Sequence, residues 1–276
     1  MADKASKSLI IYGDGCVKQI SSSHIHLHHL VSRGCSGFLS LAQSPNAESE
    51  DERVVRELAQ LLDAFDSTLS NCRFMGLKAA IVSTNSNVKS FGRYLGFTVL
   101  EFDDLTKDKP SFDEPLSCEL LKLLGFHGGE TLETSEFDLV FLHLGCKCIN
   151  SLVGGILQIA QPGSEIGSRL HLSVVMSCGA SVDDEDSSLL QLNSLKENSN
   201  LSLLFPRQSY THHEGSCRHH SPMLITQWQE AVTRKDMAEI FSFQDIKEKG
   251  GNLVIPADRF LHEVAFKLWK APKYGA

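Results

Sequence analysis

The sequence has no basic run and no long apolar run. Its 276 residues include 26 Lys or Arg and 34 Asp or Glu, which gives a formal net charge of −8. A chain of this charge without a Lys/Arg-rich segment is poorly suited to a nucleic-acid backbone or an anionic membrane surface. The longest apolar stretches, such as residues 137–144, are too short to span a bilayer. We therefore expect protein partners, with no nucleic acid and no membrane, and the sequence leaves the oligomeric state open.

No secretion signal precedes the first strand-like segment at residues 8–12, since the sequence shows neither an apolar signal region nor a cleavage site there. The expected location is the cytosol, with access to the nucleus. Eight cysteines are scattered along the chain, and in such a compartment they are expected to be thiols and not disulfides. Cys146 and Cys148 form the closest pair, but no second close pair completes a zinc site.

The common nucleotide and nucleophile motifs are also absent. The sequence contains no Gly-x-x-x-x-Gly-Lys-Ser/Thr, no Gly-x-Gly-x-x-Gly and no Gly-x-Ser-x-Gly, which argues against a phosphate-binding loop, a dinucleotide fold and a hydrolase elbow. No cofactor is expected. Because no phosphate-binding motif is present, we interpret Gly13-Asp14-Gly15 first as a structural tight turn.

What the sequence does contain is an alternation of strands and helices. Strand-like segments occupy residues 8–12, 37–41, 78–83, 98–102, 136–144, 170–176 and 221–228, and helix-like segments occupy 24–33, 54–69, 87–95, 116–124, 152–160, 243–249 and 257–268. The alternation predicts one α/β domain over residues 1–276, with a doubly wound, mostly parallel sheet and helices on both faces. Residues 103–112 are predicted to be a polar connection, and residues 44–52 and 183–199 to be mobile loops.

Ligands of doubly wound sheets bind beyond the carboxyl ends of the strands. Asp14 and His143 stand at such ends, and the sequence Ser177-Cys178 follows a third strand. His143 closes an apolar strand and is expected to be a hydrogen-bonded core histidine. The segment that leads into the late strand is rich in histidine, with His212, His213, His219 and His220.

Several segments, in chain order, are similar to cofactor-independent phosphoglycerate mutases of the archaeal type, in the alkaline phosphatase superfamily. They are Leu-Ile-Ile-Tyr-Gly-Asp-Gly at 9–15 and the segments at 27–39, 75–81, 88–96, 137–143 and 241–261, the last with paired glycines. The resemblance implies an alkaline phosphatase-like core, with Asp14 as a metal-binding carboxylate and His219 or His220 as a second ligand.

The chain also departs from that family. No segment between the helix at 54–69 and the next strand is long enough for the family's inserted transferase domain, and residues 144–150 lack its metal-binding aspartate and histidine. The family's Ser-Asp-His is replaced by Ser177-Cys178-Gly179. Two-metal phosphoryl chemistry needs several hard ligands for each ion, and one aspartate with one histidine cannot provide them.

The resemblance and its departures support two hypotheses. The first is a non-catalytic alkaline phosphatase-like protein that acts as a binding or scaffold module. The second is a metal-dependent phosphatase or phosphoryl hydrolase that uses Mn²⁺, Zn²⁺ or Mg²⁺ with an unorthodox ligand set, drawn from Asp14, Cys178, His212, His213, His219 and His220. A thiolate at Cys178 would favour a soft metal.

Other candidates remain open from the sequence. His24 and His28 are spaced for a zinc pair on a helix, or they belong to a plain surface helix. A catalytic residue stays unknown, because nothing selects a nucleophile among Ser40, Ser44 and Ser49. With few cations nearby, Asp14 is expected to be satisfied by the backbone of its glycine turn, by a histidine or by water.

Overall fold

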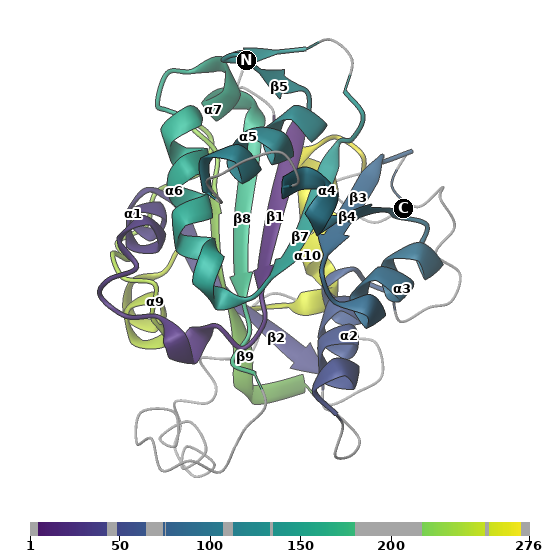
Figure 1. Ribbon diagram of the computed structural model, residues 1–276. Helices are drawn as coiled ribbons and strands as arrows, with labels where there is room; N and C mark the ends of the chain where they lie inside the picture. The colour runs from purple at the N-terminus through teal and green to yellow at the C-terminus, as the bar shows by residue number, and fades with distance from the viewer. Residues whose placement is uncertain are drawn as a thin grey trace.

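An eight-stranded sheet forms the centre of the molecule (Figure 1). The computed structural model describes residues 5–42, 49–64, 74, 76–106, 113–132, 135–179, 217–251 and 254–271. In space the strands follow the order β10-β2-β9-β8-β1-β7-β3-β4. Their bounds are β1 Lys7–Gly13, β2 Cys35–Ala42, β3 Ala79–Ser83, β4 Thr98–Glu101, β7 Leu139–Leu144, β8 Leu170–Met176, β9 Cys217–Trp228 and β10 Val254–Pro256.

The sheet is mostly parallel, as the sequence predicted. β1 runs parallel to both of its neighbours, β7 and β8, whereas β9 runs antiparallel to β8 and β2. Strand β1 is buried on both faces: Leu9 and Ile11 belong to one apolar cluster, and Ile10 and Tyr12 belong to the other. Burial on both faces is why this strand reads as a continuous apolar run and not as an alternating pattern.

Helices cover both faces of the sheet (Figure 1). The first layer contains α1 Ile25–Arg33, α5 Asp113–Leu123, α6 Ile149–Ile159 and α9 Phe243–Lys249, and the second contains α2 Glu50–Leu61, α3 Ser86–Tyr94 and α10 Phe260–Lys267. The remaining short elements are α4 Phe102–Thr106, α7 Glu165–Arg169, η1 Val17–Gln19, η2 Cys146–Cys148, η5 Ala257–Arg259 and the small hairpin β5 Phe126–His127 with β6 Glu130–Thr131. Among the described helices, none has the length and apolar character needed to cross a bilayer.

Helix α2 corrects one prediction. The acidic stretch at 44–52 was expected to be a mobile loop, but residues 50–52 form the first turn of this helix. Ser49 caps the helix by accepting a hydrogen bond from the backbone N–H of Glu52, and the Glu52 side chain accepts from the backbone N–H of Ser49. Carboxylates are favourable in a first helical turn, because they face the positive end of the helix dipole. The helix ends at Leu61, before the predicted limit of residue 69.

Two further predictions need correction. Residues 103–112 were expected to be a connection, but α4 occupies the first part of that range. The late strand was expected to begin at residue 221, but β9 begins at Cys217, so that His219 and His220 lie within a strand and not in a loop. The predicted mobile segment 183–199 lies outside the described residues.

Candidate functional site

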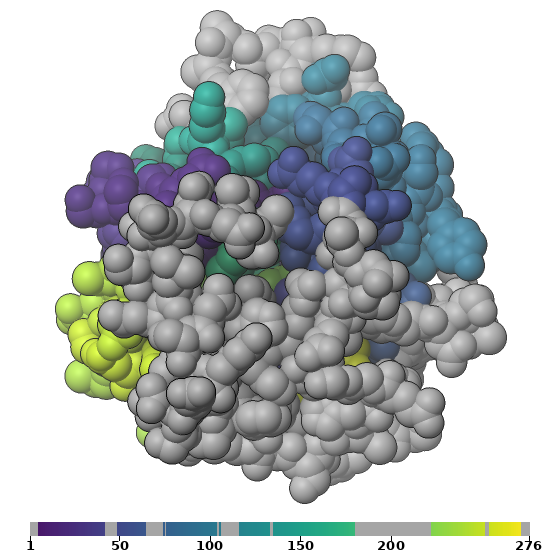
Figure 2. Space-filling view, turned by 90° about the horizontal axis from the view of Figure 1, so that it is seen from below, coloured from purple at the N-terminus to yellow at the C-terminus, as the bar shows by residue number. Residues whose placement is uncertain are grey.

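The ends of β1 and β8 build the edge of the sheet at which ligands were expected. This edge is at the lower end of Figure 1, and Figure 2 views the molecule from that side, with the purple N-terminal segment beside the blue region of α2. The backbone N–H of Ser177 donates to the carbonyl oxygen of Gly13 (3.0 Å), and the N–H of Gly15 donates to Ser177 Oγ (2.9 Å). Ser177 Oγ in turn donates to Asp14 Oδ1 (3.1 Å). Asp14, at the end of β1, thus lies directly beside Ser177, the first residue after β8.

Glycines flank Asp14 on both sides. A Cβ atom at Gly13 would lie 2.6 Å from Ile149 Cδ1 and 2.9 Å from Cys16 Sγ, so these side chains would have to move. Gly15 has φ +62°, a left-handed conformation that side-chain-bearing residues rarely adopt. The two glycines thus set the sharp turn that points Asp14 away from the end of β1.

Arg53 supplies the cation that Asp14 faces. Its Nη2 atom lies 2.8 Å from Asp14 Oδ1, and its Nη1 atom donates to Glu57 Oε2 at 3.1 Å. The Arg53 side chain is only 6% exposed and that of Glu57 5%. Burial opposes the charge on Arg53, but the carboxylates of Glu57 and Asp14 raise its pKa. This arrangement corrects the prediction that Asp14 is satisfied by its own turn, by a histidine or by water.

Tyr12 extends the same polar chain into the core. Its hydroxyl donates to Glu57 Oε2 at 2.7 Å, and the side chain is fully buried. Burial, together with the negative charge of Glu57, raises the pKa of Tyr12 well above its ordinary value, and burial also raises the pKa of Glu57. The result is one continuous network, in the order Tyr12, Glu57, Arg53, Asp14 and Ser177.

Ser83 and His143 form a second buried pair near Tyr12. Ser83 Oγ accepts from the backbone N–H of Asn85 (3.0 Å) and is also hydrogen-bonded to His143 Nδ1 at 2.8 Å. Burial lowers the pKa of His143, which favours the neutral ring, and that ring stacks on Tyr12 with centroids 5.6 Å apart. His143 is thus the satisfied core histidine that the sequence predicted.

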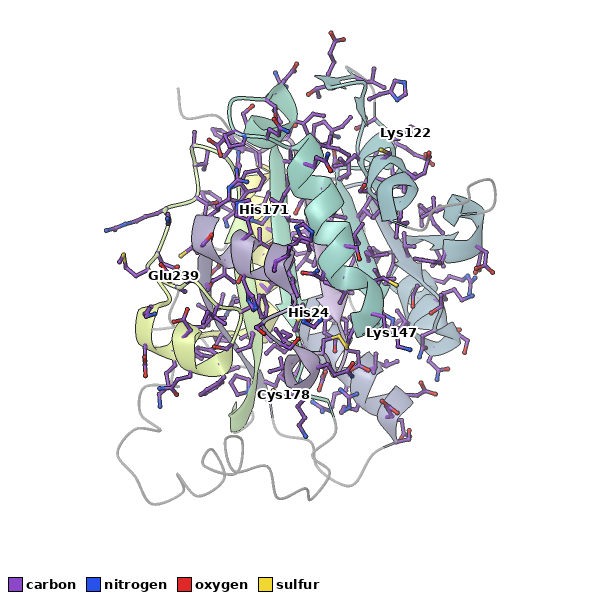
Figure 3. All side chains as sticks on the ribbon, turned by 60° about the vertical axis from the view of Figure 1, so that its left-hand side comes forward. His24, Lys122, Lys147, His171, Cys178 and Glu239 are labelled. Atoms are coloured by element: carbon purple, nitrogen blue, oxygen red, sulfur yellow. A yellow bond between two sulfur atoms is a disulfide. The ribbon has the colours of Figure 1, made fainter. Side chains whose placement is uncertain are left out.

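Cys178 carries a largely buried thiol. Its Sγ atom lies 3.7 Å from the carbonyl oxygen of Pro222, and burial raises the pKa of the thiol to about 11. A thiol with this pKa is protonated at neutral pH unless a bound metal ion displaces the proton. Figure 3 shows Cys178 at the same end of the molecule as Lys147, far from the buried His171.

A disulfide overturns the prediction that the cysteines are thiols for two of them, whereas Cys35, Cys118, Cys148 and Cys178 form no disulfide. Cys16 and Cys146 are bonded, with Cα atoms 5.2 Å apart, although 130 residues separate them in sequence. The bond joins the loop after β1 to the loop after β7, because these strands are neighbours in the sheet. The two sulfur atoms lie 3.3 and 3.7 Å from the carbonyl oxygen of Asp14. Disulfide sulfurs carry no proton, so these are contacts and not hydrogen bonds.

Four of the histidine candidates have no described side chain, whereas His24 and His28 do. His212 and His213 lie outside the described residues, and His219 and His220 belong to β9, in a part where only the backbone is described. His28 uses both ring nitrogens: Nδ1 accepts from the backbone N–H of Phe241 (3.1 Å), and Nε2 donates to the carbonyl oxygen of Ser21 (3.0 Å). The pair with His24 is therefore not free to bind zinc through His28.

None of the serine candidates gains support as a nucleophile. Ser40 Oγ donates to the carbonyl oxygen of Ile255 at 3.4 Å, and the residue is buried. Ser49 is the N-cap of α2, and Ser44 lies outside the described residues.

The described residues do not fit a divalent metal. No group of three or more His, Cys, Asp and Glu side chains among them is placed to hold an ion. The carboxylate at the expected position already faces a guanidinium group, and a divalent cation beside it would be repelled. What the geometry provides is a largely buried cluster in which one guanidinium group, that of Arg53, faces the two carboxylates of Asp14 and Glu57.

Sequence reasoning missed Arg53 and Glu57. The available signal was that the two residues are four apart and share a helix face with the apolar residues Val54, Leu58 and Leu61. A charged pair at this spacing more often lies on the helix surface, so the spacing alone did not predict burial. Nothing in the sequence indicated that its partner would be Asp14.

Comparisons with known proteins concern the fold. No family model and no curated protein sequence matches the chain. Among solved structures, the PH0037 protein from Pyrococcus horikoshii matches with a TM-score of 0.57 and 13% identity, over 100% of both chains. A cofactor-independent phosphoglycerate mutase from Thermoplasma acidophilum matches with a TM-score of 0.48 and 9% identity, over 95% of this chain and 100% of that one.

A third solved structure is a protein of the alkaline phosphatase superfamily from Vibrio parahaemolyticus, with a TM-score of 0.45 and 11% identity, over 83% of this chain and 61% of that one. At 13% identity, the match to the PH0037 protein concerns the arrangement of strands and helices and leaves activity open.

Proposed function

We propose that this protein is a non-catalytic member of the alkaline phosphatase-like fold and acts as a binding or scaffold module for protein partners in the cytosol, with access to the nucleus. The supporting observation is the ion pair between Arg53 and Asp14, with 2.8 Å between Nη2 and Oδ1. In the family that the sequence resembles, the equivalent carboxylate binds a metal ion. Here a side chain of the protein supplies the positive charge.

The charges around Asp14 support the same proposal. Arg53 is held by two carboxylates, and Glu57 is itself fixed by the hydroxyl of Tyr12. An arginine in this setting keeps its charge at any working pH, because guanidinium does not deprotonate in proteins. Metal binding at Asp14 would therefore require the guanidinium group to leave a buried site in which each of its terminal nitrogens lies beside a carboxylate.

The competing hypothesis is a metal-dependent phosphatase, and one pair of measurements separates the two. The purified full chain is incubated with Mn²⁺ or Zn²⁺, freed of excess ion, and assayed both for bound metal and for hydrolysis of p-nitrophenyl phosphate. We expect no stoichiometric metal, and no turnover above that of Asp14→Ala. Stoichiometric metal together with turnover that disappears in Asp14→Ala would overturn the proposal.

A gain-of-binding experiment tests the role of Arg53 directly. Arg53→Ala removes the internal cation and leaves Asp14 and Glu57 facing the vacated space. We expect Mn²⁺ to raise the Tm of Arg53→Ala but not that of the wild type, because a ligand that binds the native state stabilises it. The effect should disappear in Arg53→Ala/Asp14→Asn.

Arg169→Ala is the matched control, because this arginine is 48% exposed on α7 and pairs only with Glu165 among the described residues. A Mn²⁺ response of Arg169→Ala equal to that of Arg53→Ala would show that the ion binds elsewhere, and the assignment of Arg53 as the resident cation would be wrong.

A further inference from the structure

A cavity opens at the amino edge of the sheet, opposite the edge that holds Asp14. It lies among the turns that lead into β3, β4 and β7, and its volume is about 580 Å³. Pockets for small molecules commonly have volumes of about 300–1,000 Å³. Nothing in the network around Asp14 takes part in this cavity, so it is independent of the proposed function.

The inner wall of the cavity is apolar. Leu62, Phe137 and Leu261 contribute buried side chains to it, each less than 5% exposed. Phe74 and Phe97 complete the wall, and both are partly buried hydrophobic residues packed against the α10 side of the core. Two aromatic rings that remain partly accessible in such a wall provide an apolar surface suited to a flat ring or a short hydrocarbon chain.

The mouth of the cavity carries charge. Lys78 and Glu136 line it, both are exposed, and neither forms an ion pair within the described residues. Asp138 lies beside them but is already neutralised: Lys7 and Lys270 pair with its oxygens at 3.0 and 3.3 Å. The backbone N–H of Lys78 also donates to Asp138 Oδ2 at 3.2 Å.

These charges favour an anion at the mouth. The two charged residues that line the cavity, Lys78 and Glu136, balance each other, whereas next to the lining two lysines, Lys7 and Lys270, share the single carboxylate of Asp138. Because Lys7 and Lys270 are committed to Asp138, the ammonium group of Lys78 is the one available to a ligand.

We propose that this cavity binds a small aromatic carboxylate or sulfonate, with its ring against the apolar wall and its anionic group beside Lys78. The two halves of the ligand are recognised by different parts of the site, so two matched probes can test them separately. The probes are 8-anilinonaphthalene-1-sulfonate, which is an aromatic anion, and N-phenyl-1-naphthylamine, which has the same aromatic skeleton without the charge.

The experiment is a fluorescence titration of the full-length protein with each probe. Thr98→Phe is the blocking variant, because Thr98 lines the cavity, is exposed, and begins β4, where an aromatic residue is tolerated. We expect saturable binding of one sulfonate per wild-type chain, and a loss of affinity of about tenfold or more for both probes in Thr98→Phe. Lys78→Glu should weaken the sulfonate by about tenfold and leave the uncharged probe unchanged.

Lys147→Glu is the charge control, because Lys147 is an exposed lysine of η2 at the opposite edge of the sheet. Equal binding by Thr98→Phe and the wild type would place the probes outside the cavity and overturn the proposal, as would the absence of saturable binding by the wild type. Equal weakening by Lys147→Glu and Lys78→Glu would overturn the assignment of the anionic group to Lys78. If Thr98→Phe does not fold, as judged by circular dichroism, Thr98→Leu takes its place with the same two outcomes.

Discussion

Removing the guanidinium group of Arg53 should lower the free energy of unfolding of the protein. Arg53→Met keeps most of the aliphatic stem and removes the charge. Asp14 then loses its cation at 2.8 Å and Glu57 its donor at 3.1 Å. The hydroxyls of Ser177 and Tyr12 remain as donors to these two carboxylates, so each of them keeps one hydrogen bond.

The expected loss of stability is large. Removing one partner of a buried ion pair typically costs about 3–5 kcal/mol, because an uncompensated charge stays in the interior. Burial already raises the pKa of Glu57, and the charge of Arg53 opposes that rise, so without Arg53 this carboxyl should take up a proton more readily. Protonation limits the cost, so we expect about 3 kcal/mol, the lower end of that range.

A double-mutant cycle in urea measures the effect, with unfolding followed by the fluorescence of the buried Trp228. Glu57→Gln removes the second charge, and in Arg53→Met/Glu57→Gln the penalty should fall by about 1–2 kcal/mol, because only Asp14 then lacks a partner charge. Arg93→Met serves as the control, since this arginine is 59% exposed and its contact with Glu101 is long, at 3.8 Å. The control should change the free energy of unfolding by less than about 0.5 kcal/mol.

Arg53→Met with a free energy of unfolding within about 1 kcal/mol of the wild type would refute this reasoning, because an exposed ion pair contributes no more than that. The network of Arg53, Asp14 and Glu57 would then not be buried as described. Additive effects of Arg53→Met and Glu57→Gln would likewise show that the two side chains do not interact.

Three further predictions concern the core and the polar groups within it. Phe141→Ala should lower the free energy of unfolding by about 3–5 kcal/mol, since Phe141 is fully buried in central β7; an unchanged Tm would place the strand at the periphery. Burial and the nearby charge of Lys267 hold the pKa of His171 well below its ordinary 6.5. The contribution of His171 to the free energy of unfolding is therefore fully present above pH 6.5 and is lost as pH falls, by up to about 1.4 kcal/mol per pH unit. His171→Asn should flatten that pH dependence of urea unfolding, and an unchanged slope would contradict the assignment. Reducing the Cys16–Cys146 disulfide should cost about 5 kcal/mol, because it closes a loop of 130 residues; a Tm that is insensitive to dithiothreitol would show that the bond is absent.

The order of strands and helices was readable from the sequence because it rests on local patterns. The buried strands β1 and β7 appear as continuous apolar runs, and the helix of residues 243–249 was predicted with the bounds that α9 has. The predicted boundaries of helices and strands were wrong where the local composition fitted more than one structure. The acidic residues 50–52 suggest a loop by their charge, yet the same charges stabilise the first turn of α2 once Ser49 caps it.

Only part of the candidate site could be predicted from the sequence. The position of Asp14 at a strand end follows from Gly13 and Gly15, which the sequence displays. The cation that faces Asp14 does not follow, because Arg53 lies 39 residues further along the chain, on a helix whose docking depends on the whole second layer. The disulfide between Cys16 and Cys146 was missed because the expected compartment favoured thiols, and because only the pairing of β1 with β7 brings these two cysteines together.

The sequence by itself determined the class of fold and the edge of the sheet at which charged residues collect, because periodicity and strand ends are local properties of the chain. Only the tertiary structure decided which charges meet there. Burial and through-space distance set the partner of Asp14, the pKa of Cys178 and the pairing of Cys16 with Cys146. These quantities depend on residues far apart in the sequence, and no local pattern contains them.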